Sequence, residues 1–102
     1  MREEKIETPD GVFFVRALTY GEVKKVLKNA GVTKIRMLGG EPVQWEIDIA
    51  DLQYHLLLES VKDGNGEKIS VEKLDSLTLD TINILTNKAL ELTPIFRLLG
   101  QA

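Results

Sequence analysis

Asp51, His55 and Glu59 come closest, by residue type and spacing, to a catalytic or metal-binding set. They recur every fourth position, so a helix would carry them along one stripe. Acid–base or metal chemistry would also need groups from a second element, and the chain offers one His and no Cys. We therefore favour a stripe on the protein surface without catalytic or metal chemistry. We expect no catalytic residue.

The loop 63–67 is a second candidate, because its Asp, Asn and Gly residues are typical of calcium-binding turns. Aligning Gly66 with the invariant glycine of an EF-hand puts Asp63 and Glu72 on ligand positions. Val61 then occupies the first ligand position, where the site needs an Asp. Without that carboxylate much of the charge that holds a hard cation is missing. We expect a polar turn between two helices, with no metal and no cofactor.

The composition excludes several classes of protein. A chain of 102 residues forms one domain, and hydrophobic and charged shares of 43% and 28% are ordinary for a soluble protein. A net charge of −3 argues against a nucleic-acid binder. No apolar run reaches the roughly 18 residues of a membrane span, and the charged start is no signal peptide. The absence of Cys is compatible with a reducing compartment, so we expect a cytoplasmic protein.

One long helix must organise the elements that position these residues. On a helical wheel, residues 49–62 are apolar over most of the circumference and leave one narrow polar stripe. A helix of this kind packs on two or more sides. Asp48 is suited to cap its start. We predict a helix over 49–62 as the most buried element, with Leu57 in the core.

The N-terminal region predicts a β-hairpin, in which 3–8 and 12–18 flank a Pro-Asp-Gly turn. Arg16 interrupts an apolar run and is interpreted as an outward-facing residue on an edge strand. Two further strands over 34–38 and 43–47 would join the first hairpin in one small antiparallel sheet, with a mobile tip between them as the alternative.

Three more helices are predicted, over 20–30, 71–77 and 79–92, and Ser70 is expected to cap the second of them. Thr19 and Glu22 have the spacing of a capping box, and Gly31 is placed to end the first helix. Thr78 is expected to cap the last helix. Pro94 ends it, because the residue before a proline resists helical ψ.

These elements predict an α+β fold, in which an N-terminal antiparallel β-hairpin or small sheet packs on three to four α-helices. The domain covers 1–102. Its β-rich parts are 1–18 and, less firmly marked, 32–47, and its helical parts are 19–31 and 48–99.

Four short motifs occur in a fixed order along the chain: Leu-Thr-x-x-Glu at 18–22, Asp-x-x-Gly at 63–66, Glu-x-Leu-x-x-Leu at 72–77 and Leu-x-Leu at 90–92. A strand rich in apolar residues leads into the first, and helices precede the second and the last. This order resembles the tail assembly chaperones of long-tailed bacteriophages and prophages. The similarity covers most of the chain and leaves 32–47 unmatched.

The resemblance implies a non-enzymatic chaperone that coats the helical tape-measure protein and recruits tail-tube subunits in the cytoplasm of the host cell. A homo-oligomer stays possible, and the charge and the lack of a long apolar run predict no nucleic-acid or membrane partner. Such a protein needs apolar side chains that are exposed to its partner. Each candidate residue fits a place in the hydrophobic core equally well. The candidates are Trp45, Ile84, Ile95, Phe96 and Leu99.

Two other functions stay open. The first is a structural virion or tail-completion protein that remains in the particle. The second is a small metal-dependent enzyme that uses the stripe of Asp51, His55 and Glu59.

Overall fold

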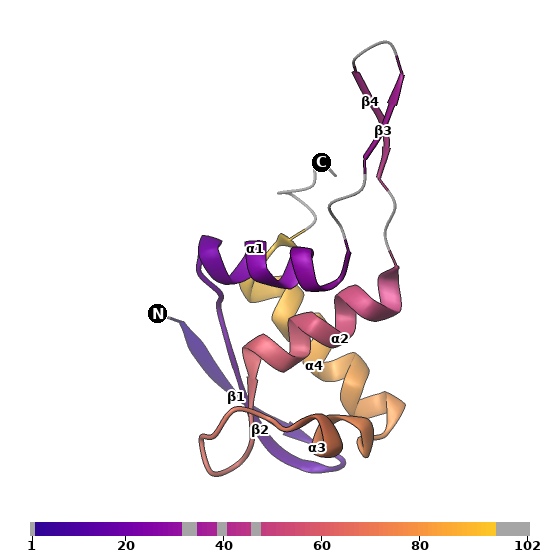
Figure 1. The fold of residues 1–102 in the computed structure, drawn as a ribbon. Coiled ribbons are helices and arrows are strands. Elements are labelled where there is room, and N and C mark those ends of the chain that lie inside the picture. The colour runs from indigo at the N-terminus through magenta and orange to yellow at the C-terminus, as the bar shows by residue number, and fades with distance from the viewer. Residues whose placement is uncertain (1, 32–34, 39–40, 46–47, 96–102) are drawn as a thin grey trace.

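The computed structural model describes residues 2–31, 35–38, 41–45 and 48–95. Within these residues the elements are, in order, β1 (Glu3–Thr8), β2 (Gly11–Arg16), α1 (Tyr20–Asn29), β3 (Ile35–Leu38), β4 (Glu41–Trp45), α2 (Ile49–Ser60), β5 (Val61–Lys62), α3 (Val71–Asp75) and α4 (Leu79–Leu92). A three-stranded antiparallel sheet has the order β1-β2-β5, and β3 and β4 form a separate two-stranded sheet. The predicted α+β class is confirmed (Figure 1).

The first hairpin forms as predicted and closes between Thr8 and Gly11, whose φ of 118° is accessible to glycine. The third strand was not expected. β5 pairs with β2 in the register Val15↔Val61, and both valines are fully buried. β2 is therefore the central strand, so the interpretation of Arg16 as an edge-strand residue is wrong.

The predicted central helix is correct from its start to Ser60 and wrong beyond it. Asp48 caps α2, since its Oδ1 accepts from the backbone N–H of Asp51 at 3.2 Å. Val61 leaves the helix with extended φ and ψ of −99° and 134° and joins the sheet. A β-branched residue suits a strand, and pairing with a buried valine outweighs one more helical turn.

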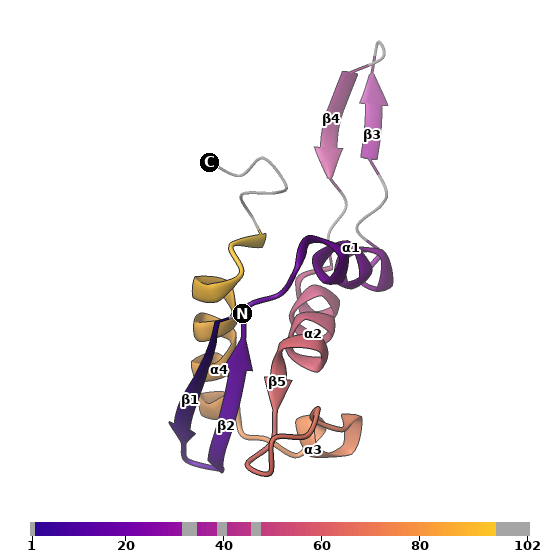
Figure 2. The same cartoon turned by 90° about the vertical axis from the view of Figure 1, so that its left-hand side faces the viewer.

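α2 is buried on two sides, as its sequence predicts, because it packs against both α1 and α4. Its leucines Leu52, Leu56 and Leu57 lie in the core. Figure 2 shows α4 beside β1 and β2, and α2 continuing into β5. The core thus lies between the sheet and the helices.

The other helix boundaries follow the predicted signals closely. Thr19 and Glu22 form the capping box of α1, and Gly31, with φ of 74°, follows its last turn. α3 is shorter than predicted. α4 ends at Leu92, before Pro94. Among the helices that the structure describes, none is long and apolar enough to cross a membrane.

The second hairpin does not join the first sheet, contrary to the prediction. β5 already occupies the second edge of β2. Figures 1 and 2 both show β3 and β4 projecting from the end of the molecule opposite the β1–β2 turn.

Candidate functional site

Two residues of the predicted stripe on α2, His55 and Glu59, contact different groups. Glu59 is engaged by cations, since its Oε2 lies 3.1 Å from Lys68 Nζ and 3.6 Å from Lys25 Nζ. The His55 ring instead contacts Tyr54 edge to face, with centroids 5.4 Å apart. No group of three or more His, Cys, Asp or Glu residues that could hold a metal occurs in the described parts of the chain.

Arg16 ties three elements together. Its guanidinium donates to both carboxylate oxygens of Glu22, at 2.9 and 2.5 Å, and to the backbone carbonyl of Glu59 at 3.1 Å. The Arg16 guanidinium and the Thr19 N–H lower the pKa of Glu22 to about 2. Glu22 in turn raises the pKa of Arg16. This cluster joins β2, α1 and α2, and the lone arginine in an apolar run was its only sequence signal.

The loop 63–67 uses its carboxylate to hold its own turn. Asp63 Oδ1 accepts from the backbone N–H of Asn65 at 2.8 Å and of Glu67 at 3.1 Å. Gly66 adopts φ of 82° at the same turn. These contacts match the predicted polar turn, although it joins β5 to α3 and not two helices.

The predicted apolar contacts fall in different places. Ile84 is 37% exposed on α4. Ile95 is only 1% exposed and belongs to the core, which corrects its assignment to a partner surface. Trp45 lies in β4, whose side chains are outside the described part of the chain, as are Phe96 and Leu99.

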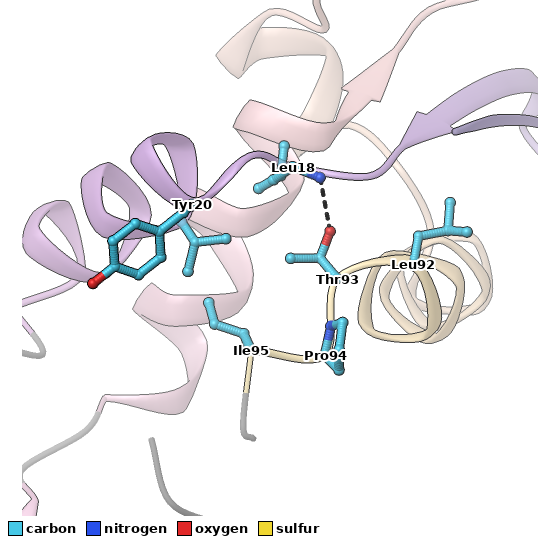
Figure 3. Close-up of a pocket in the computed structure, with 7 residues that line it drawn as sticks. Leu18, Tyr20, Leu92, Thr93, Pro94 and Ile95 are labelled. Carbon is cyan, nitrogen blue, oxygen red and sulfur yellow. Dashed lines mark hydrogen bonds between the residues drawn. The ribbon is translucent and has the colours of Figure 1, made fainter. Parts of the chain in front are cut away.

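A shallow apolar cleft lies between the start of α1 and the end of α4 (Figure 3). Its volume is about 180 Å³. The buried Thr93 links the end of α4 to the segment before α1, since its Oγ1 accepts a hydrogen bond from the backbone N–H of Leu18 at 3.0 Å. The exposed Tyr20 stands at the cleft, with Lys24 Nζ 5.4 Å from its ring centroid.

A larger apolar hollow, the α2–α4 hollow, has a volume of about 240 Å³. Its apolar lining comes from α2, α3 and α4 and includes Ala50, Tyr54, Leu57, Leu74, Leu79 and Ile82. Leu79 is 79% exposed. It lies in the first turn of α4, on the side away from the buried Thr81, Leu85 and Ala89.

A second hollow of about 160 Å³ lies between α2 and α4 on the other side of Gln53. Gln53 Nε2 donates to Thr86 Oγ1 at 2.8 Å and links the two helices there. Ile49, at the start of α2, contributes to this hollow and is 60% exposed. Two large apolar side chains thus stand in solvent beside apolar hollows.

Comparisons with protein-family models, curated proteins and solved structures find no match to this chain. The α2–α4 hollow with Leu79 is the best candidate site, because it combines a mostly apolar lining with a large exposed apolar side chain. An arrangement of this kind binds apolar side chains and offers no chemistry of its own.

Proposed function

We propose that this protein is a non-enzymatic tail assembly chaperone of a long-tailed bacteriophage or prophage. It binds helical segments of the tape-measure protein and recruits tail-tube subunits in the host cytoplasm. The order of its motifs, from the Leu-Thr-x-x-Glu helix start to the closing Leu-x-Leu, supports this family.

The structural observation that carries the proposal is the exposure of Leu79 and Ile49 beside apolar hollows. Neither residue is needed to complete the core, which is already filled by buried side chains from the sheet and all four helices. Apolar surface exposed beside a hollow marks a site for another molecule more often than isolated apolar residues do. An amphipathic helix laid in a groove is one of the recurring ways to cover such surface.

Two observations test the proposal against its alternative. The neighbouring reading frame should encode a very long, helix-rich protein, and that protein should co-purify with this chain when both are expressed together. Mass spectrometry of assembled particles should then find the tape-measure protein without this chain. Its presence in particles at a fixed copy number would instead identify a structural virion or tail-completion protein.

A further inference from the structure

We infer that the α2–α4 hollow binds a partner helix whose single apolar stripe is flanked by lysine or arginine. The inference rests on the proposed function only in taking the partner to be a helix. The chemistry of that helix comes from the hollow itself. The hollow thereby sets which segments of a long helical partner are bound.

The size and walls of the hollow suit aliphatic side chains presented by a helix. At about 240 Å³ it exceeds the roughly 150 Å³ of an engineered apolar cavity that holds benzene. Leu57 and Leu74 line the hollow and are buried, so part of its wall belongs to the apolar core. Leu79 stands on one wall with most of its side chain in solvent. A partner helix that docks there would cover Leu79 and place the apolar side chains of its stripe in the hollow.

The charge in the lining of the hollow selects the flanks of that helix. Asp75, an exposed residue of α3, lines the hollow. None of the described residues that line the hollow is a Lys or Arg. Complementary charge at an interface favours cationic partners and suppresses acidic ones.

Ile84 lies on a different side of the same helix. Ile84 comes five positions after Leu79, which is about 140° around an α-helix. It does not line the α2–α4 hollow. Ile84 remains a partner contact predicted from the sequence. Comparing peptide binding by variants of Leu79 and of Ile84 tells which of the two surfaces of α4 binds the peptide.

Two synthetic helical peptides of about 20 residues, long enough to span the domain, provide the probes. They share one leucine stripe and differ only in lysine or glutamate beside it. Fluorescence anisotropy with labelled peptides gives the Kd for each. We expect the lysine peptide to bind at least about tenfold more tightly at low salt. The difference should shrink near 1 M salt, where the screening length is about 3 Å.

Matched variants locate the site. Leu79→Ser should raise the Kd of the lysine peptide at least about fivefold, the effect of removing one important contact. Ile84→Ser should leave it within about twofold. Asp75→Asn should reduce the preference for lysine, because it removes the carboxylate that lines the hollow. Circular dichroism should show unchanged folding, because these side chains are exposed.

Three results would overturn the inference: equal binding of both peptides, no effect of Leu79→Ser, or a stronger effect of Ile84→Ser. A dimer of the wild-type chain that Leu79→Ser dissociates would show that a second copy occupies the hollow. Failure of the chaperone proposal looks different, because the lysine peptide would still bind while no tape-measure segment did.

Discussion

Asp10 and Thr78 are 68 positions apart, yet Asp10 Oδ2 accepts hydrogen bonds from both the N–H and the hydroxyl of Thr78, each at 2.8 Å. Thr78 is the N-cap of α4 but makes no side-chain cap bond to its own helix. The turn between β1 and β2 therefore supplies the capping carboxylate from a distance. A negative charge there also suits the positive end of the helix dipole.

Asp10→Asn should lower the midpoint of thermal unfolding, because it removes this charge from the start of α4. The Thr78 N–H and the hydroxyls of Thr81 and Thr78 lower the pKa of Asp10 below 3.8. A lowered carboxyl pKa gives stability that is present above pH 3.8 and is lost as the pH falls through the folded value. Asp75→Asn, on an exposed part of α3, is the control, and an equal effect of both changes would refute the capping role.

Glu22→Gln should destabilise the protein by about 1–2 kcal/mol near neutral pH, because it breaks the paired contact with Arg16 at a partly screened site. The pKa of Glu22 is lowered from 4.5 to about 2. The difference between wild type and variant should be full above pH 4.5 and should vanish toward about pH 2. Chemical unfolding at several pH values measures it, with Glu72→Gln as the control. A difference that does not change with pH would contradict the assignment.

Leu57→Ala should cost about 2–5 kcal/mol, the range for truncating a buried leucine. Leu57 is 1% exposed, belongs to the core and lines the α2–α4 hollow. Ile49→Ala, in the exposed first turn of the same helix, should change the free energy of unfolding by less than about 0.5 kcal/mol. If Leu57→Ala lowers the free energy of unfolding by less than this limit, α2 is not the central helix of the core.

Thr93→Val should cost about 1–3 kcal/mol, because it leaves the N–H of Leu18 without its acceptor at a buried junction. Thr93→Ser keeps the hydroxyl and is the matched control. Hydrogen exchange reads the effect directly: the Leu18 amide should lose protection in the valine variant and keep it in the serine variant. Protection retained in both would show that this contact does not hold α4 to the strand that precedes α1.

The sequence predicts features whose causes are local. The capping box at Thr19, the cap at Asp48 and the end of α4 before Pro94 depend on neighbouring residues, and all three are correct. The β1–β2 turn is likewise specified by its own residues.

Features that depend on distant partners could not be predicted this way. Val61 fits the helical period of α2, and only its pairing with Val15 makes it a strand. Arg16 was placed at an edge because nothing near it indicates β5. Leu79 continues the apolar pattern of α4, but the residues of that helix that the fold buries are Thr81, Leu85 and Ala89, and Leu79 is exposed. The candidate site was missed for this reason.

The central claim is that this chain binds helical segments of a tape-measure protein. Titrating the wild-type protein with overlapping segments of the long product of the neighbouring reading frame tests it most directly. We expect at least one segment, with an apolar stripe flanked by Lys or Arg, to bind with a Kd near 1 μM, about −8 kcal/mol. The Leu79→Ser variant should weaken that binding. If no segment binds the wild-type protein, the chaperone function is contradicted.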